Sequence, residues 1–456
     1  MRRTTKDPGT LAVHRFGLGA RPGERADVQG DPRGWLLAQL RPTRRLPKRL
    51  AARPGHPELF VEHARQKATE EDGKAARRWA RTVYVDDRLA RFVHASTTTA
   101  PFRERWARFF SNHLCVSARK RMVTFLAGAH EREAIRPHIV GRYASLLLAS
   151  TRHPAMLIYL DNRQSMGPDS AMGRAKDKGL NENLARELLE LHTVGVDGGY
   201  TQQDVTELAK MLTGWTIRTP SKGARRQQTA FVFAARRHQP GRKQLMGQTY
   251  AETGVTETER ALKQLAAHPS TARHIAYKIA VHFVADDPPE PIVADLARRF
   301  RDTDGDLRAV GEHLIQDDRV WTEAARNPKL RTPEEVAIAM VRASGWQDRS
   351  AEIPDEIRSM EKAIQNMGHL PLSPPSPAGW PDRQEDWAGP EQILRRIELA
   401  EKTGNGLGRQ VRDPREYADD ILGDRLHPDT RKAIARAPDS GTAMGLLLAS
   451  PEFQWR

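Results

Sequence analysis

Apolar residues recur every three or four positions along most of this chain, and this spacing restricts the fold more than any other feature. The spacing is clear in WLLAQL (35–40), YASLLLAS (143–150), VTELAKMLTGW (205–215) and EEVAIAMVRASG (334–345). Side chains so spaced lie on one face of an α-helix, whereas a strand needs apolar residues at every second position. The sequence therefore predicts a mainly α, multi-helical protein built as a single large domain.

Three segments interrupt this helical pattern. Residues 227–250 alternate around Phe231 and Phe233 and turn at Pro240-Gly241, which predicts a small β-hairpin. PLSPPSPAGWP (371–381) is too rich in proline for a helix, so we expect an extended crossing loop. RPTRRLPKRLAARPGHPEL (41–59) is the best candidate for a mobile linker. The predicted organisation is an N-terminal arm and linker (1–60), a helical core (61–370) and a C-terminal helical segment packed on the core (371–456).

The chain is strongly basic. Its 456 residues carry a net charge of +15, and only 16 of the 73 basic residues are lysines. Either a coding bias toward arginine or a basic face for an anionic partner explains this charge. No helix-turn-helix, aromatic RNA-binding or zinc-finger pattern accompanies it, so nucleic acid is not the expected partner.

Compartment and membrane association also follow from composition. No apolar run approaches the roughly 18 residues that a membrane span needs. The N-terminal residues lack the apolar segment of a signal peptide, and the single Cys115 excludes an internal disulfide. We expect a cytoplasmic protein, while export together with a partner protein stays open.

A polar stripe marks the predicted helix in GLNENLARELLELH (179–192). At about 100° per residue, five side chains fall within an arc of roughly 140°: Glu182, Asn183, Arg186, Glu187 and Glu190. One interpretation is a solvated face, with Arg186 pairing at about 0.2–0.5 kcal/mol per ion pair. The other is a cleft wall, with Glu187 and Glu190 as acid and base, Arg186 tuning them, and Asn181, Glu182 and Asn183 binding substrate. His192 falls among the leucines and is expected in the core or at its rim.

This stretch, extended to LTGWT at residue 216, resembles the signature of the bacterial DUF1800 family. Other blocks resemble that family in the same order: HRFGLGARPGE (14–24), FFSNHLCVS (109–117), EREAIRPH (131–138), RHPAMLIYLDNRQSMGP (152–168), HPSTARHIAYKIAVHFVADDPP (268–289) and TPEEVAIAMVRASG (332–345). The resemblance implies a largely helical bacterial protein, often encoded beside an exported phosphatase- or sulfatase-like protein, which is the expected partner. It implies no reaction.

Two single residues are further candidates for substrate binding. His113, in Ser111-Asn112-His113, is either a buried residue that joins helices or a substrate contact. Asp161, in a polar loop after an apolar segment, is either a turn residue or part of the same cleft.

Two further pairs of residues contain histidine or lysine. His238 and Lys243 flank the predicted hairpin turn and form either a mobile basic tip that closes over an anionic substrate or a plain surface hairpin. His274 and His282 lie two turns apart on one predicted helix and are interpreted as core and rim residues.

Motifs for metals and nucleotides are absent. The 16 histidines include no His-x-x-x-His or His-Glu-x-x-His, so no metal site is expected, and no cofactor is indicated. Two functions remain. One is a carboxylate-based hydrolase or lyase acting on a polar substrate, such as a cell-envelope polymer. The alternative is a non-catalytic helical scaffold or chaperone for the exported partner.

Overall fold

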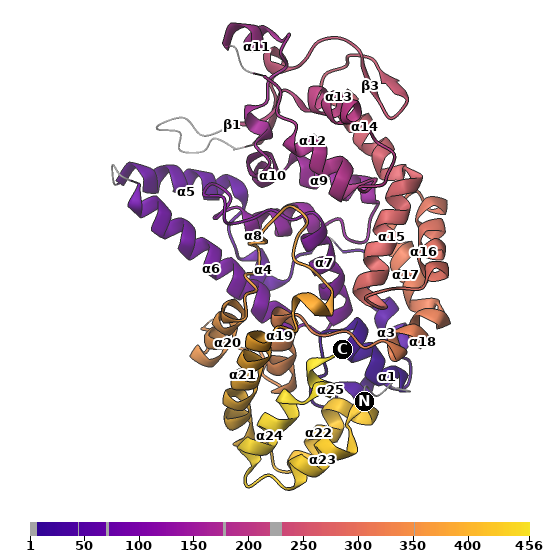
Figure 1. Cartoon of the computed structure of the whole chain (residues 1–456). Helices are drawn as coiled ribbons and strands as arrows, with labels where there is room; N and C mark the ends of the chain where they lie inside the picture. Colours follow the sequence, from indigo (N-terminus) through magenta and orange to yellow (C-terminus); the bar gives the residue numbers. More distant parts are fainter. Residues whose placement is uncertain (1–6, 44, 70–72, 177–178, 219–229, 351) are drawn as a thin grey trace.

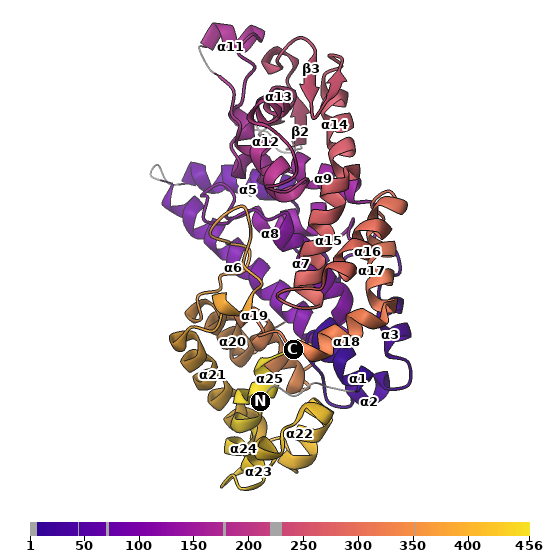
Figure 2. The ribbon, with the colours of Figure 1, turned by 45° about the vertical axis from the view of Figure 1, so that its right-hand side comes forward.

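The chain is an elongated stack of helices with two small sheets at one end (Figure 1). The computed structural model describes residues 7–43, 45–69, 73–176, 179–218, 230–350 and 352–456. In both views, helices α19–α25 lie at the end opposite α9–α14 and the strands, and α5–α7 and α15–α18 lie between them (Figure 2). The predicted mainly helical class with one large domain is confirmed.

The N-terminal third contains α1 (Pro8–Leu11), α2 (Glu24–Val28), α3 (Pro32–Ala38), α4 (Lys48–Ala51), α5 (His56–Thr69), α6 (Lys74–Thr97), α7 (Pro101–His113), α8 (Ala127–His130), η2 (Glu131–Ile135), α9 (Tyr143–Arg152) and α10 (Pro154–Tyr159). The middle contains α11 (Ala171–Lys176), α12 (Asn183–Glu187), η4 (Leu188–His192), α13 (Gln202–Leu212), β1 (Trp215–Arg218), β2 (Ala230–Phe233), β3 (Lys243–Leu245), β4 (Gln248–Tyr250), α14 (Val255–Ala267), α15 (Pro269–Phe283), α16 (Glu290–Asp302), α17 (Leu307–Gln316) and α18 (Asp318–Arg326). The C-terminal part contains α19 (Pro333–Ala343), α20 (Asp355–Asn366), α21 (Pro390–Gly408), α22 (Pro414–Leu422), α23 (Pro428–Ala435), α24 (Ser440–Ala449) and α25 (Pro451–Gln454).

Many helices begin where a capping side chain precedes a proline. Thr332 caps α19 in a capping box with Glu335, and Pro333 occupies the first turn. Asp306 accepts hydrogen bonds from two backbone N–H groups at the start of α17. The first backbone N–H groups of a helix have no intrahelical acceptor, so a capping oxygen can pair with them and a proline, which lacks the N–H, loses nothing there. The fixed φ of proline also suits the first helical turn. The sequence predicts both starts, because DTDGD (302–306) and Thr332-Pro333 stand directly before apolar residues with helical spacing, and the structure confirms them.

The β structure near residues 227–250 is confirmed, but its pairing differs from the predicted hairpin. Phe231 and Phe233 belong to β2, which pairs antiparallel with β1. A second hairpin joins β3 to β4 across Met246 and Gly247, so the turn does not lie at Pro240-Gly241. Gly247 has φ +79°, a conformation that glycine adopts at little cost. Residues 227–229 of this region belong to the segment 219–229, which lies outside the described part of the chain.

Two buried apolar clusters form the core, and α6 contributes to both. Val83 belongs to the first cluster, which gathers residues between 11 and 324, while Phe92 belongs to the second, which is dominated by residues 336–453. Val13 and Leu36 from the N-terminal region also belong to the first cluster. The three-part domain division stays a prediction. Within the described residues, no helix is both long and apolar enough to span a membrane.

A closed ring of six buried charges lies where the two clusters meet. Its members alternate in sign: Arg91, Glu131, Arg136, Glu104, Arg108 and Glu334, with Glu334 returning to Arg91. The N···O distances lie between 2.5 and 3.0 Å, and no side chain is more than 10% exposed. These residues come from α6, α7, α19 and the two ends of η2, where Glu131 is the first residue and Arg136 follows the last, so the ring joins elements from both apolar clusters.

Removing one carboxylate from the ring leaves two buried guanidinium groups with one counter-charge each instead of two, and gives the ring a net positive charge. Glu131 pairs with Arg91 and Arg136 and accepts a hydrogen bond from Ser111. We expect Glu131→Ala to lower the free energy of unfolding by about 3–5 kcal/mol, measured by urea denaturation. The exposed pair of Arg308 with Glu312 is the control, and Glu312→Ala should cost about 0.5 kcal/mol or less. Equal losses in both variants would contradict a structural role for the ring.

The ring also makes the free energy of unfolding depend on pH in the acidic range. Burial by itself raises the pKa of Glu334, but the Arg108 and Arg91 guanidiniums outweigh it and lower that pKa from 4.5 to about 2. The stabilisation from this carboxylate is therefore complete above pH 4.5 and is lost as pH falls toward 2. We expect the free energy of unfolding to fall by on the order of 3 kcal/mol across this window. Glu334→Gln should flatten that part of the pH profile, and an unchanged profile would contradict the assignment.

Candidate functional site

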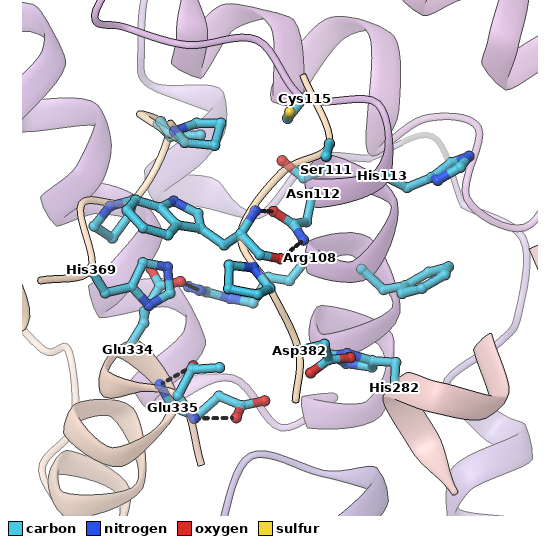
Figure 3. Close-up of a pocket in the computed structure, with 18 of the residues that line it drawn as sticks. Arg108, Ser111, Asn112, His113, Cys115, His282, Glu334, Glu335, His369 and Asp382 are labelled. Carbon is cyan, nitrogen blue, oxygen red and sulfur yellow. Dashed lines mark hydrogen bonds and ion pairs between the residues drawn. The ribbon is translucent and has the colours of Figure 1, made fainter. Parts of the chain in front are cut away.

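A cavity of about 380 Å³ lies beside the charged ring, between α7, α15, α19 and the crossing segment 369–386 (Figure 3). Polar lining residues include Arg105, Ser111, Asn112, His113, Cys115, Lys278, His282, Glu334, Glu335, His369 and Asp382. Several come from the segments FFSNHLCVS, HPSTARHIAYKIAVHFVADDPP and TPEEVAIAMVRASG, which lie far apart in the sequence. The fold therefore brings three of the distinctive sequence blocks to one cavity.

The proline-rich segment forms one wall of the cavity and is held there by Asn112. The Asn112 amide donates to the Trp380 carbonyl and accepts from the Trp380 N–H, both at 2.8 Å (Figure 3). Gly379 precedes this contact with φ +87°, and a Cβ at that position would lie 2.6 Å from the Asn112 carbonyl oxygen. The backbone approaches so closely that only glycine fits. The predicted extended crossing loop is thus found in the structure, and it is packed against α7.

Aromatic rings extend this wall. The centroid of His369 lies 4.8 Å from Trp380 and 5.0 Å from Trp387, and the two tryptophans lie 5.8 Å apart. These separations are typical of favourable ring packing. The indole N–H of Trp380 and Nδ1 of His369 are buried and have no hydrogen-bond partner.

His282 and Asp382 form a dyad on the opposite side of the cavity from Glu334 and His369 (Figure 3). Nδ1 of His282 lies 2.6 Å from Oδ2 of Asp382, while Nε2 is buried without a partner. Burial lowers the pKa of His282, and Asp382 opposes that effect. The carboxylate therefore holds the ring with its proton on Nδ1 and leaves a lone pair on Nε2.

Asp382 is suited to hold this orientation because it stays ionised. Burial alone raises its pKa, but His282, Lys329 and Arg456 together bring the pKa below its ordinary value. Arg456 also contacts Glu335, at 3.3 Å. An ionised carboxylate that fixes a histidine tautomer is the arrangement found behind general bases.

Lys278 lines the cavity one helical turn before His282 on α15. Its side chain is half-buried, and within the described chain its amine makes no hydrogen bond or ion pair. Burial lowers the pKa of this amine, while Cys115 and Asp382 act in the opposite direction. A lysine of lowered pKa is available as a neutral nucleophile or, when protonated, as an anion-binding group.

Cys115 does not have the properties of a nucleophile. Its thiol donates to the Pro377 carbonyl at 3.3 Å, and burial raises its pKa to about 12. Nucleophilic cysteines need the opposite shift, because the thiolate is the reactive form. Cys115 is a buried packing residue of the cavity wall.

His113, a predicted substrate contact, lines the cavity. The Tyr143 hydroxyl donates to the His192 carbonyl, so it accepts the 2.9 Å hydrogen bond from Nε2 of His113. Nδ1 of His113 has no partner. His192 is 1% exposed, and burial lowers its pKa to about 3, so the predicted core position is confirmed.

The polar stripe does not line this cavity. Glu182 and Arg186 pair at 3.2 Å, and both contact Gln202 of α13, while Thr206 donates to Glu182 at 2.7 Å. This half of the stripe therefore ties α12 to α13. Asn181, beside them, accepts a hydrogen bond from the Asn183 N–H and donates its own N–H to Ser165. Asn183 is exposed.

Glu187 and Glu190 form the other half of the stripe. Both are half-buried, and burial raises the pKa of Glu187, with a further contribution from the nearby Glu190 carboxylate. The Glu190 carboxylate also hydrogen bonds to the Tyr200 side chain. A raised carboxyl pKa is a property of general acids, so these residues keep their predicted role as a proposal.

His238 and Lys243 are not on an exposed basic tip, which corrects the sequence interpretation. They are 6% and 2% exposed and both contact the Glu257 carboxylate, at 3.0 and 2.8 Å. The segment instead packs against α14, which carries Glu257, and Nδ1 of His238 is hydrogen bonded to the Thr213 carbonyl at 2.9 Å. Asp161, the remaining candidate, pairs with Lys120 at 2.6 Å and does not line the cavity.

One group in the described chain has the spacing of a metal site: His56, Glu133 and His153, whose ligand atoms lie within 4.8 Å of one another. Glu133 accepts from Nε2 of His153 at 3.0 Å and from the backbone N–H of His56. Nδ1 of His153 accepts from the Ala155 N–H, so the proton is on Nε2. A metal would need the lone pair of that atom, so the group fits a hydrogen-bonded clamp better.

His282, Lys278 and Asp382 were missed as site residues from sequence. His282 was interpreted as a rim residue, and Asp382 follows the proline-rich loop without a recognisable motif. The available signal was the spacing of Lys278 and His282, four residues apart on one helix, which places both on the same face.

Comparison with known proteins gives a family without an activity. A family model described as "Protein of unknown function (DUF1800)" matches residues 11–455, nearly the whole chain. No curated protein and no solved structure matches the sequence.

The contact between Asn112 and Trp380 predicts how the cavity wall is held. Asn112→Leu keeps the side-chain size but removes both hydrogen bonds, which together contribute about 1–3 kcal/mol. We expect amide hydrogen exchange in residues 378–386 to rise by roughly tenfold or more, measured by mass spectrometry. Exposed Asn366 provides the control, and Asn366→Leu should leave exchange in this segment unchanged. Unchanged exchange in Asn112→Leu would mean that other contacts hold the segment.

Proposed function

Because the chain belongs to the DUF1800 family, whose function is unknown, we propose a function from the cavity itself. The protein is an enzyme of the hydrolase or lyase type that acts on a small polar substrate by acid–base chemistry. The observation that carries this proposal is the His282–Asp382 dyad, in which Nδ1 is held at 2.6 Å and Nε2 is left unpartnered.

The dyad supports proton transfer in three ways. Asp382 fixes the tautomer, so Nε2 can accept a proton without ring rotation. The carboxylate also stabilises the imidazolium that forms. Burial lowers the pKa of the ring, so the resting ring is neutral near pH 7 and Nε2 is free to accept a proton. A general base so placed contributes typically 10²–10⁴-fold to a reaction rate.

The rest of the lining favours a substrate rich in oxygen acceptors. The Lys278 amine, the Trp380 indole N–H and one guanidinium nitrogen of Arg105 all lack partners among the described residues. Buried donors are normally satisfied, and each one left unpaired costs about 1–3 kcal/mol. A carboxylate, phosphate or carbonyl oxygen would satisfy them.

The carboxylate pair on α12 and η4 is a second candidate for the same type of reaction. Glu187 and Glu190 lie one turn apart, Arg186 is adjacent, and the pKa of Glu187 is raised. Substrate contacts would then come from Asn181, Asn183 and Glu182. Loss of turnover in Glu187→Gln, with the melting temperature unchanged, would favour this pair over His282.

A non-catalytic scaffold for an exported partner is the alternative function. It is favoured by Leu394 and Ile397, which are 54% and 46% exposed and lie three residues apart on α21. Exposed apolar residues that share a helix face are typical of protein contacts. A partner complex that is lost in Leu394→Glu would support it.

The cavity proposal predicts separate effects on binding and turnover. We expect a panel of small carboxylates, phosphates and carbonyl compounds to include a ligand that raises the melting temperature, since binding stabilises by about 2.7 kcal/mol at 100 times the Kd. His282→Asn keeps a donor for Asp382 but removes Nε2. It should retain this shift and lose about 10²–10⁴-fold in turnover of that ligand.

His274→Gln is the matched control for this experiment. His274 lies two turns before His282 on α15, but its Nε2 is already bonded to the Leu191 carbonyl at 3.0 Å. Turnover should survive in this variant. Equal losses in both variants would remove His282 from the mechanism.

A further inference from the structure

Lys278 lines a cavity but has no carboxylate paired with its amine among the described residues. Lys120, Lys210, Lys243 and Lys329 each contact a carboxylate. Lys278 makes no such contact within the described residues, although it lines a partly enclosed cavity rather than the open surface. Ammonium groups removed from water without a counter-ion are costly, and the amine responds by losing its proton more readily.

The groups that face Lys278 leave its amine reactive. Asp382 is already engaged by His282, Lys329 and Arg456, so its charge is shared. Cys115 remains a neutral thiol. His113, His192 and His274, which lie near Lys278, are neutral as well because their pKa values are lowered by burial. Burial therefore dominates, and it lowers the pKa of the Lys278 amine. A neutral amine is the form that attacks carbonyl carbon.

A proton carrier lies one turn away on the same helix. His282 follows Lys278 by four residues on α15, so the two side chains project from one face. Nε2 of His282 is buried and unpartnered, and Asp382 keeps its lone pair available. A nucleophilic amine with a held base beside it is the combination that imine formation needs.

We propose that Lys278 forms an imine with an aldehyde or ketone substrate in this cavity, an inference that rests on the function proposed above for the same site. The Nζ lone pair attacks the carbonyl carbon, a C–N bond forms, and the C=O π electrons move to oxygen. The amine gives up a proton to Nε2 of His282, and that proton passes to the oxygen to form a carbinolamine.

The second half of the step eliminates water. Nε2 of His282, which has taken up a proton from solvent, gives that proton to the hydroxyl. The nitrogen lone pair forms the C=N bond as the C–O bond breaks, so the hydroxyl leaves as water and the product is a protonated imine. Loss of its N–H proton to Nε2, and from there to solvent, gives the neutral imine. The balance is one amine and one carbonyl in, one imine and one water out, with the solvent proton returned and no oxidant or reductant. An iminium withdraws electrons from the adjacent carbon, so it suits a lyase that breaks a bond at that carbon.

Reductive trapping tests the proposal on the unmodified chain. The protein is incubated at neutral pH with pyruvate or with glycolaldehyde, each together with sodium cyanoborohydride, and the modified lysines are mapped by peptide mass spectrometry. We expect Lys278 to be modified about tenfold faster than other lysines. Exposed Lys402 and buried, ion-paired Lys243 are internal controls in the same sample. His282→Asn should slow the modification of Lys278 without slowing that of Lys402.

Two other outcomes separate this inference from the proposed function. If pyruvate raises the melting temperature while Lys278 is modified no faster than Lys402, then the lysine binds the pyruvate carboxylate as ammonium. The imine is then overturned and the cavity remains a site. Both proposals fail if neither probe binds, Lys278 is unreactive, and no ligand of the wider panel raises the melting temperature. Lys278→Arg keeps the charge but cannot form the imine, so it should abolish trapping while retaining any anion binding.

Discussion

The ring of three arginines and three glutamates is the interaction on which the rest of the structure depends. Apolar burial supplies most of the driving force for folding, but it is non-directional and does not fix how two clusters of helices face each other. The ring does so, because each guanidinium must meet two carboxylates at 2.5–3.0 Å. Its total charge is zero and each of its ionised groups has two partners of opposite sign. Such closed networks stabilise a particular arrangement, whereas partly satisfied ones destabilise it.

The cavity follows from that arrangement. Arg91, Arg108 and Glu334 of the ring also line the cavity, so this half of the ring forms part of the cavity wall. Glu335, the next residue on α19, contacts Arg456, and Arg456 in turn contacts Asp382, which holds His282. A series of charged contacts therefore runs from Glu335, the neighbour of the ring residue Glu334 on α19, to the dyad. This connection explains why an orienting carboxylate on a proline-rich loop can be positioned well: the loop is tied to α7 through Asn112 and to α19 through Arg456.

What could be predicted from sequence was local. Helix periodicity, the Thr332 and Asp306 caps, the packed proline-rich loop and the buried position of His192 all depend on residues a few positions apart, and all are found. The ring could not be predicted, since Arg91 and Glu334 lie 243 positions apart and neither belongs to a motif that names its partner. The predicted position of the hairpin turn was wrong for the same reason. The partner of β2 is β1, which precedes residues 219–229, and not a strand beyond Pro240. Amphipathic spacing identified α15 as a helix, yet it could not tell that the face carrying Lys278 and His282 borders a cavity.

The polar stripe and the cavity differ in how completely their polar groups are paired, and this difference carries the functional argument. Glu182 and Arg186 have partners on α13, so their polarity is used within the fold. Around the cavity, Nε2 of His282 and the Trp380 indole N–H have none. Unpaired buried nitrogens also occur elsewhere in the described chain, as on Arg15, Trp215 and His313, but those of His282 and Trp380 belong to residues that line a cavity. Each costs about 1–3 kcal/mol when left unpaired. A ligand that pairs with them would regain that energy, so unpaired groups at a cavity favour the binding of a ligand with complementary polar atoms.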